Sequence, residues 1–293
     1  MNLYEETKFL IKKYNVTANK KLGQNFLIDD EVVSKIIEKS DISKNDLVIE
    51  IGPGLGTLTK PLLEKAKKVI CVELDYKMLS ILEDRFKLYD NFELINDDIL
   101  KVDLNSIISN TKKEYDDIKQ VKIVANLPYY ITTPIIMRLL EENLDIDSIT
   151  VMIQKEVADR LAETPGGKNT GAITYSVYYY ATAEKICLVP NQSFIPQPEV
   201  NSEVIKLEVR KKPVINTNKE LLFSIIKSAF MQRRKTLVNA LSSNDIFKNM
   251  SKNEIESIVR QAGVNEKTRG EKLSIEDYNR IVKILEARVI KEK

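Results

Sequence analysis

A short apolar run that leads directly into a glycine-rich turn is the feature that most limits the fold of this chain. Leu47–Ile51 predicts a buried strand, Gly52–Gly56 follows it at once, and a helical pattern then continues to Leu63. Three further apolar runs end in polar residues in the same way, at Lys68–Leu74, Phe92–Ile95 and Val121–Ala125. Strands that alternate with helices favour a mostly parallel sheet with helices on both faces.

The rest of the chain divides near residue 211. Ser148–Ile153 predicts a fifth strand, while Lys185–Val189 and Val204–Val209 predict a closing hairpin around a proline-rich loop. Beyond the hairpin only helical patterns follow, at Glu220–Phe230, Asn253–Gln261 and Ile275–Ala287. We therefore expect an α/β domain of residues 1–211, in which residues 1–28 form an arm that loops over the fold, and a helical domain of residues 212–293.

The glycine-rich turn and a later acid predict a nucleoside site. Glycines let the backbone turn tightly against a ligand, and the next helix presents free N–H groups. Glu73 ends the second strand, 21 residues after Gly52, where a carboxylate accepts hydrogen bonds from both hydroxyls of a ribose. A dinucleotide fingerprint has its third glycine one residue after Gly56, which argues against a nicotinamide dehydrogenase. The spacing Gly52-x-Gly54-x-Gly56 resembles the S-adenosylmethionine (SAM) loop of class I methyltransferases.

A second motif, Asn126-Leu127-Pro128-Tyr129, follows the fourth strand and predicts the chemistry. Ligands of an open α/β sheet bind beyond the carboxyl ends of its strands. There the Asn126 side-chain oxygen and the Leu127 carbonyl can accept the two N–H bonds of an aromatic amine, which frees the nitrogen lone pair. Pro128 fixes φ and removes a donor, and Tyr129 can stack on a base swung out of its helix. The tetrapeptide resembles the Asn/Asp-x-Pro-aromatic motif of methyltransferases that act on adenine N6, cytosine N4 or glutamine.

The chain contains no histidine, which excludes Ser-His-Asp and Cys-His catalysis and most catalytic zinc sites. Methyl transfer from a sulfonium fits such a chain, because the displacement mainly needs alignment and the methylated nitrogen loses its proton to water. We therefore expect SAM as methyl donor and no metal. By the resemblance to class I methyltransferases, Asp98 at the end of the third strand would receive the adenine amine of SAM, with Asp97 as the alternative.

Charge is balanced overall at +2, but two segments are basic. Residues 1–21 carry five lysines against two glutamates, and residues 206–238 carry nine Lys or Arg against two glutamates. Two such segments can line one groove for a polyanion, although basic segments are also typical of a solvated surface. Two cysteines cannot form a disulfide framework, and the chain shows neither a signal peptide nor an apolar run that could span a bilayer. We therefore expect a cytoplasmic protein with no membrane association.

A series of motifs resembles one known family over nearly the whole chain. These motifs are Lys21–Leu27, Glu50–Gly56, Val72–Asp75, Asn126–Pro134, Gln154–Arg160, Phe194–Pro198, Phe230–Leu237 and Leu273–Tyr278. They resemble the ribosomal RNA adenine dimethylases, in the small-subunit (16S) branch. The resemblance implies a class I SAM-methyltransferase (Rossmann-like) domain with a mostly parallel seven-stranded sheet, and a smaller C-terminal all-helical domain that binds rRNA. It implies a monomer that dimethylates the N6 amines of two adjacent adenines, in a hairpin loop at the 3′ end of 16S rRNA, during small-subunit biogenesis.

The resemblance also implies a role for each matching residue. Cofactor contacts are implied for Asn25, Leu27, Gly52, Gly54, Glu73, Asp98 and Asn126. The target amine would lie against Asn126, Leu127 and Pro128, with its base sandwiched between Tyr129 and Phe194. Contacts with rRNA are implied for Lys20, Lys21, Arg233, Arg234 and Lys235.

Two segments depart from the family pattern, and two alternatives stay open. The proline-rich loop reads Pro196-Gln197-Pro198 and then Val200-Asn201-Ser202, and Thr170-Gly171-Ala172 replaces the usual Tyr-Gly-Arg. These departures leave the substrate-loop contacts undefined. One alternative is a 23S rRNA adenine methylase of the macrolide-resistance type, which typically reads Asn-Ile-Pro-Tyr. The other is a ribosome-assembly factor that binds without catalysis, against which the intact Asn126, Glu73 and Asp98 argue.

Overall fold

The computed structural model describes residues 1–291, without the side chains of Lys20 and of residues 289–291. The chain forms two compact units. The first contains Met1–Ala158 and Thr182–Val209, and the second contains Asp159–Ala181 together with the chain from Arg210 onward. Residues 159–181, which we expected in the α/β domain, thus pack within the second unit. The reason is helix α8 (Ala172–Tyr180), whose buried residues include Tyr175 and Tyr179 of the second unit's apolar core.

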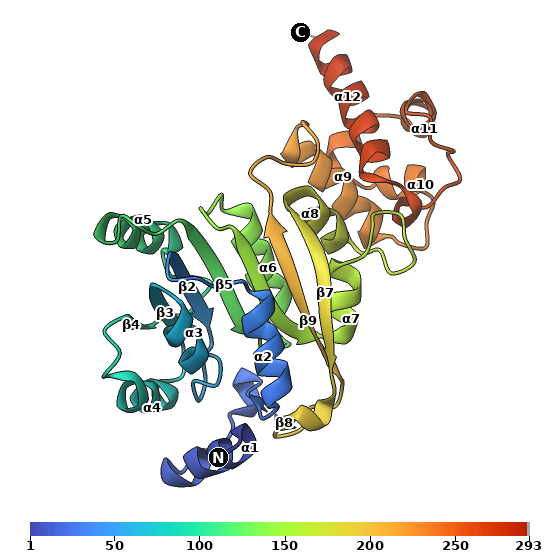
Figure 1. The fold of residues 1–293 in the computed structure, drawn as a ribbon. Coiled ribbons are helices and arrows are strands. Elements are labelled where there is room, and N and C mark those ends of the chain that lie inside the picture. Colours follow the sequence, from blue (N-terminus) through green and yellow to red (C-terminus); the bar gives the residue numbers. More distant parts are fainter. Residues whose placement is uncertain (292–293) are drawn as a thin grey trace. The chain divides into compact units, whose positions relative to one another are not determined.

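A seven-stranded sheet of order β4-β3-β2-β5-β6-β9-β7 forms the centre of the first unit (Figure 1). Neighbouring strands among β4, β3, β2, β5 and β6 are parallel, and β9 pairs antiparallel with β6. The expected mostly parallel, seven-stranded sheet is therefore confirmed. The strands are β2 (Asp46–Ile51), β3 (Lys68–Glu73), β4 (Phe92–Asn96), β5 (Gln120–Asn126), β6 (Ser148–Gln154), β7 (Ala181–Val189) and β9 (Ser202–Val209).

The central strands β2 and β3 are buried along their whole length, which explains why their sequences are continuous apolar runs rather than alternating ones. The register pairs Ile51 with both Val72 and Ala125, and Glu73 with Asn96. The carboxyl ends of the parallel strands consequently meet at one edge of the sheet. This edge brings together the residues that follow each strand, although they are far apart in the sequence.

Helices follow the strands where the sequence supplies caps. The Asp29 side chain accepts from the Glu31 and Val32 backbone nitrogens, and the Asp75 side chain accepts from that of Lys77. Asp29 caps α2 (Asp30–Lys39), and Asp75 caps α4 (Tyr76–Phe86). The other helices that follow strands are α3 (Thr59–Lys65), α6 (Thr132–Glu141) and α7 (Lys155–Leu161).

Residues 1–28, which we expected to form an arm that loops over the fold, contain regular secondary structure. Helix α1 (Leu3–Lys13) begins with a capping box between Asn2 and Glu5. It is followed by the short helix η1 (Lys20–Leu22) and strand β1 (Phe26–Leu27). Strand β1 pairs antiparallel with β8 (Phe194–Ile195), which follows the short helix η2 (Asn191–Ser193). A further helix that the sequence analysis did not predict, α5 (Leu104–Glu114), provides the crossover between the parallel strands β4 and β5.

The second unit is helical in its described residues, with one shared core. Tyr175 and Tyr278 pack edge to face at its centre, with ring centroids 5.3 Å apart. Their hydroxyls donate to backbone carbonyls, Tyr175 to Leu273 at 2.6 Å and Tyr278 to Gly270 at 3.0 Å. Besides α8, the helices are α9 (Lys219–Met231), α10 (Leu237–Leu241), η3 (Asp245–Phe247), α11 (Lys252–Gln261), η4 (Gly270–Lys272) and α12 (Ile275–Lys291).

Within residues 1–291, no helix combines the length and the apolar character that crossing a bilayer requires.

Candidate active site

Two neighbouring cavities lie at the carboxyl edge of the sheet in the first unit. The first cavity encloses about 600 Å³ of empty space when its open mouth is included, and its lining includes Glu73 and Asp98. The second encloses about 330 Å³ on the same measure, and its lining includes Asn25 and Asn126. Gly52 lines both cavities, so the glycine-rich turn lies where they adjoin. Such a pair of cavities can hold an elongated ligand across the strand ends.

Glu73 is fixed by the backbone in the first cavity. Its two carboxylate oxygens accept hydrogen bonds from the Gly54 nitrogen at 3.1 Å and the Asp75 nitrogen at 2.8 Å. Burial raises the pKa of the Glu73 carboxyl, and the backbone donors of Asp75 and Gly54 partly offset this rise. The carboxylate is thus held in one orientation, with lone pairs left to accept the two hydroxyls of a ribose.

The glycines of the turn have positive φ angles, which favour glycine over other residues. Gly52 has φ of +63°, and a Cβ atom on it would meet no atom within 4 Å, so that its surface is left to a ligand. Gly56 has φ of +82°, and a Cβ atom there would lie 2.4 Å from the ring of Phe86. Gly52 therefore serves the cavity, whereas Gly56 lets the turn pack against helix α4.

Asn126, the last residue of β5, is oriented by the N-terminal segment. Its side-chain nitrogen donates to the Asn25 carbonyl at 3.1 Å, which leaves the amide oxygen to accept from another donor. The Asn25 side chain in turn donates to the Gly23 carbonyl at 3.1 Å, and Leu27 is buried beside it in the second cavity. An amide held in this way can accept one N–H bond of an exocyclic amine, as the motif predicts.

The acids after β4 lie at the same cavity as Glu73. Both Asp97 and Asp98 line it, so the choice between them stays a prediction. The Asp98 side chain accepts from the Leu100 nitrogen at 3.0 Å, and the Asp97 side chain accepts from the Asp98 nitrogen at 2.7 Å. These contacts orient both carboxylates without using all their acceptor positions.

The model of the family described as Ribosomal RNA adenine dimethylase matches residues 15–287 of the chain. This chain belongs to that family. Family membership makes the protein a methyltransferase that uses SAM, and the two cavities, with Glu73 in one and Asn126 in the other, fit such a cofactor.

Relatives and solved structures align with almost the entire chain. A relative from Alkaliphilus metalliredigens, named Ribosomal RNA small subunit methyltransferase A, is 46% identical over 284 residues, which are 97% of each chain. A dimethyladenosine transferase from Plasmodium falciparum aligns with a TM-score of 0.76 and 26% identity, over 90% of this chain and 98% of that one. The 23S rRNA methyltransferase ErmE shares the fold, with a TM-score of 0.68 and 23% identity over 89% of this chain and all of that one. The expected class I methyltransferase fold is thereby confirmed.

The structure does not place the two expected base-stacking rings around an open cavity. Tyr129 is half-buried, and its hydroxyl lies 2.7 Å from the Ser202 hydroxyl. Phe194 is only 3% exposed and lies in strand β8, opposite Leu27 of β1. Neither ring lines the two cavities described above. Stacking of a base between Tyr129 and Phe194 stays a prediction, and it requires the Phe194 segment to move.

Leu127 and Pro128 continue the Asn126 motif into the site. Leu127 is buried, and its nitrogen donates to the Met152 carbonyl at 3.1 Å, which ties the motif to β6. Pro128 lines the first cavity. Its carbonyl accepts from the Thr132 hydroxyl at 3.0 Å, so the motif is also braced by helix α6. The role of the Leu127 carbonyl as second acceptor for the amine stays a prediction.

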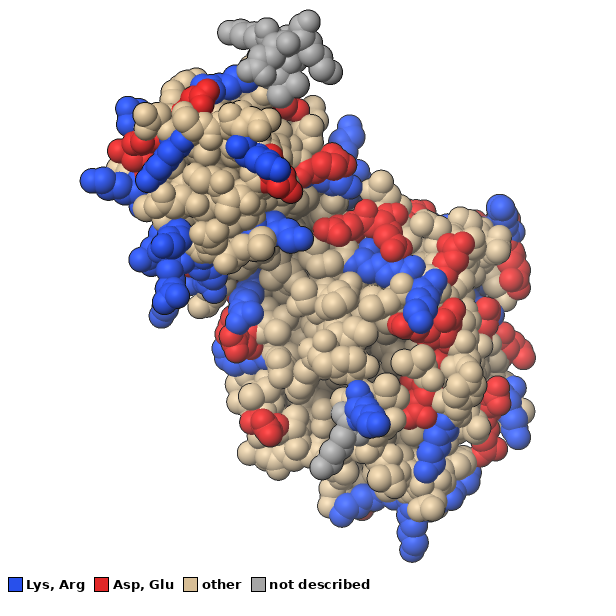
Figure 2. Space-filling view, turned by 180° about the vertical axis from the view of Figure 1, so that it is seen from behind, with Lys and Arg blue, Asp and Glu red and all other residues tan. Residues whose placement is uncertain are grey.

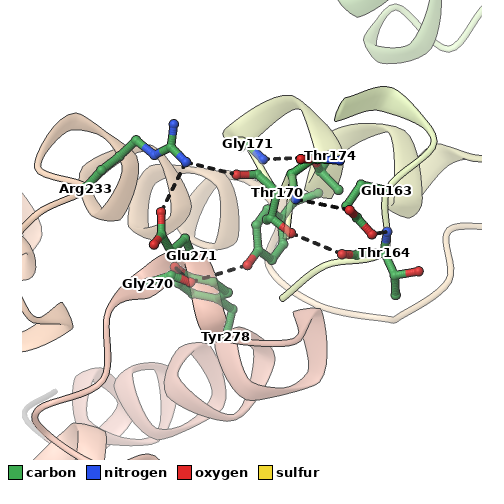
Figure 3. Close-up of polar contacts among 11 residues, drawn as sticks. Glu163, Thr164, Thr170, Gly171, Thr174, Arg233, Gly270, Glu271 and Tyr278 are labelled. Atoms are coloured by element: carbon green, nitrogen blue, oxygen red, sulfur yellow. Dashed lines mark hydrogen bonds and ion pairs between the residues drawn. The ribbon is translucent and has the colours of Figure 1, made fainter. Parts of the chain in front are cut away.

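The basic run Arg233-Arg234-Lys235 consists of one tethered and two free side chains. Arg233 forms an ion pair with Glu271 at 3.1 Å and donates to the Thr170 carbonyl at 3.5 Å (Figure 3). Arg234 and Lys235 are exposed, and their side chains form no hydrogen bond or ion pair within the described part of the chain. Figure 2 shows Lys and Arg side chains gathered along one margin of the second unit, on the face drawn there.

The two lysines expected to contact rRNA in the N-terminal segment lie at η1. Lys21 is exposed, while the Lys20 side chain lies outside the described residues. The structure therefore brings Asn25, Leu27, Gly52, Glu73, Asp98, Asn126 and Pro128 to the cavities. Lys21 is not part of the lining of either cavity.

Several further residues line the cavities without having been predicted as site residues, and three of them carry polar groups of interest. Gln24 and Tyr130 line the first cavity, and Glu50 lines the second. The Gln24 amide donates to the Asp75 side chain at 2.7 Å, which connects the N-terminal segment to the end of β3. All three are members of the motifs noted above. The sequence motifs therefore contained these residues, but only the folded strand ends show which motif residues line the cavities.

Glu50 should make the stability of the empty protein depend on pH. Burial raises the pKa of Glu50 from 4.5 to about 7, so the folded chain binds an extra proton between these values. Stability should therefore fall as pH rises from about 4.5 to about 7, by about 3 kcal/mol in total. Urea unfolding of wild type and Glu50→Gln at pH 5 and pH 7.5 measures this contribution as a difference in pH dependence. Equal pH dependence of the two proteins would contradict it.

Proposed function

We propose that this protein transfers methyl groups from SAM to the N6 amines of two adjacent adenines in a hairpin loop at the 3′ end of small-subunit (16S) rRNA. The products would be N6,N6-dimethyladenosines, made during biogenesis of the small ribosomal subunit. The observation that carries this proposal is the Asn126 amide, whose nitrogen is engaged by the Asn25 carbonyl and whose oxygen is left for an amine. The names of the curated relatives support the small-subunit substrate.

Different residues of the first unit would bind the cofactor and align the target amine. Glu73 would hold the ribose of SAM, Asp98 its adenine, and Asn25, Leu27 and Gly52 its methionine end. Asn126 and the Leu127 carbonyl would accept the two N–H bonds of the target amine and so make its lone pair available. SAM supplies an already activated methyl group, so the protein mainly has to align the amine with that carbon. The cationic nitrogen that results is acidic, and its proton leaves to water without a histidine base.

Among residues 1–291, no group of three or more His, Cys, Asp and Glu side chains is arranged to hold a metal ion. The roles above require none. We also propose that the protein is cytoplasmic, and that it acts on the small ribosomal subunit as a monomer.

The proposal is tested with isotope-labelled SAM on two substrates, under-methylated small subunits and large subunits, followed by nucleoside analysis. We expect label in dimethyladenosine of the small-subunit rRNA. Label confined to large-subunit rRNA would favour the 23S alternative. Binding to small subunits without any transfer would favour an assembly factor.

Arg234 and Lys235 should contribute to the salt dependence of small-subunit binding. Their side chains are exposed and free, so each can contact a phosphate, whereas Arg233 is already paired with Glu271. Replacing both Arg234 and Lys235 by alanine should lower the slope of log K against log salt by about 1.5, since each phosphate contact contributes about 0.7 to 0.9. Filter binding at several salt concentrations measures this slope. The charge-matched control, Lys248→Ala with Lys252→Ala, should keep the wild-type slope, and an unchanged slope in the first variant would remove both residues from the phosphate contacts.

A further inference from the structure

A polar link joins the N-terminal helix α1 to the glycine-rich turn through one arginine. Arg85 lies in the last turn of α4, and its side chain is 12% exposed. Its guanidinium donates to the Leu55 carbonyl in the turn and pairs with the Glu6 carboxylate on α1. Helix α4 thus connects a helix at the start of the chain with the turn that lines the second cavity.

The glycine-rich turn is held from two sides. On one side the Gly54 nitrogen donates to the Glu73 carboxylate at 3.1 Å. On the other side Arg85 donates to the carbonyl of Leu55, a buried residue whose polar groups need such partners. The ring of Phe86, next to Arg85 on α4, fills the space beside Gly56. Helix α3 begins after the turn without a side-chain cap, so these contacts from β3 and α4 set the conformation of the turn.

Glu6 supplies the negative charge that this buried guanidinium needs. Burial lowers the pKa of Arg85, and the charge of Glu6 partly offsets this fall. A planar guanidinium can also hold a carboxylate and a carbonyl at the same time, which fixes its direction. Docking of α1 therefore orients the donor that reaches the Leu55 carbonyl.

A second ion pair between α1 and α4 provides a natural comparison. Lys13 lies 3.1 Å from Asp84, and both side chains are nearly half exposed. Neither residue forms a hydrogen bond or ion pair with the glycine-rich turn in the described part of the chain. This pair therefore fastens α1 without acting on the turn.

We propose that Arg85 is a positioning residue for cofactor binding, which transmits the docking of helix α1 to the glycine-rich turn. This inference rests on the proposed function, which places the methionine end of SAM at that turn. Arg85 is not part of the lining of either cavity, so it acts on the ligand through the Leu55 backbone. The family match begins at residue 15, so α1 and its Glu6 lie before the matched span.

Loss of the guanidinium should weaken cofactor binding without removing a ligand contact. Arg85→Met keeps an apolar stem but leaves the Leu55 carbonyl without its donor, so S-adenosylhomocysteine should bind about tenfold more weakly. Arg85→Lys keeps the charge but lacks the planar fork that serves both partners, so its affinity should lie between those of wild type and Arg85→Met. Glu6→Gln leaves the guanidinium without its anion and should weaken binding about threefold.

Isothermal titration calorimetry with two ligands separates this role from a general loosening of the first unit. Methylthioadenosine keeps the ribose for Glu73 but lacks the amino-acid part that the turn would hold. Arg85→Met should therefore weaken S-adenosylhomocysteine much more than methylthioadenosine. The control Lys13→Gln removes the exposed ion pair with Asp84 and should bind both ligands as wild type does.

A double-mutant cycle tests whether Glu6 acts through Arg85. With Arg85→Met already present, Glu6→Gln should cause no further loss of affinity. Wild-type affinity of Arg85→Met, equal losses for both ligands, or additive losses in the double variant would overturn the proposal.

Urea unfolding checks that each variant is folded before its affinity is compared. If Arg85→Met does not fold, the comparison of Glu6→Gln with Lys13→Gln decides, and equal affinities of these two variants would overturn the proposal. Failure of wild type to bind S-adenosylhomocysteine would instead overturn the proposed function and this inference with it.

Discussion

Replacing Asn126 by alanine is expected to reduce the rate of methyl transfer by about a thousandfold, with cofactor binding partly retained. The amide oxygen is the one side-chain acceptor that the motif offers to the target amine, and loss of a fixed polar contact at a reacting centre costs about 10² to 10³ in rate. Single-turnover transfer to small subunits measures the rate, and calorimetry with S-adenosylhomocysteine measures binding separately.

Two other variants define what the Asn126 amide does. Asn126→Asp keeps an acceptor but cannot donate to the Asn25 carbonyl, so it should lose less activity than the alanine variant. Asn105→Ala removes an exposed amide from helix α5, away from the cavities, and should leave transfer unchanged. Turnover of Asn126→Ala close to that of wild type would remove this residue from the chemistry.

Replacing Glu73 by alanine is expected to weaken cofactor binding about a hundredfold or more. The carboxylate would accept two ribose hydroxyls, and each hydrogen bond to a charged group contributes about 1.5 to 3 kcal/mol. The change also leaves the Gly54 and Asp75 nitrogens without their acceptor, which loosens the glycine-rich turn. Calorimetry with S-adenosylhomocysteine measures the loss.

A control variant and an isosteric variant test whether the loss of binding comes from the Glu73 carboxylate itself. Glu83→Ala changes an exposed acid on helix α4 and should bind the ligand as wild type does. Glu73→Gln keeps the shape and one acceptor oxygen, so its loss should be smaller than that of the alanine variant. Equal affinity of Glu73→Ala and wild type would show that the ribose lies elsewhere.

The parts of the fold that follow local rules were predictable from the sequence. The buried parallel strands β2, β3 and β5 are largely continuous apolar runs. Gly52 directly follows β2, and Glu73 and Asn126 end β3 and β5, which places these three residues at one edge. Helix α5 was missed although Asp103 caps it, and the parallel pairing of the strands on either side already requires such a crossover. Helix α1 was missed because its sequence is rich in charge and its capping box is the main local signal.

The remaining features of the site depend on contacts between distant segments. Pairing of Phe26–Leu27 with Phe194–Ile195 joins two short segments, and no local pattern predicts that pairing. It buries Phe194 beside Leu27, where the family resemblance had implied a surface for a base. The contact of Arg233 with Glu271 and Thr170 is likewise tertiary (Figure 3), so a run of three basic residues could not show that its first member is tethered.

A crystal structure of the protein with S-adenosylhomocysteine and adenosine tests the central claim most directly. We expect the Asn126 amide oxygen at about 3 Å from the N6 nitrogen of the adenosine, with that nitrogen facing the cofactor sulfur. If residue 126 instead turns away from the sulfur, and no space for a purine opens beside it, the assignment of this edge of the sheet to adenine methylation is contradicted.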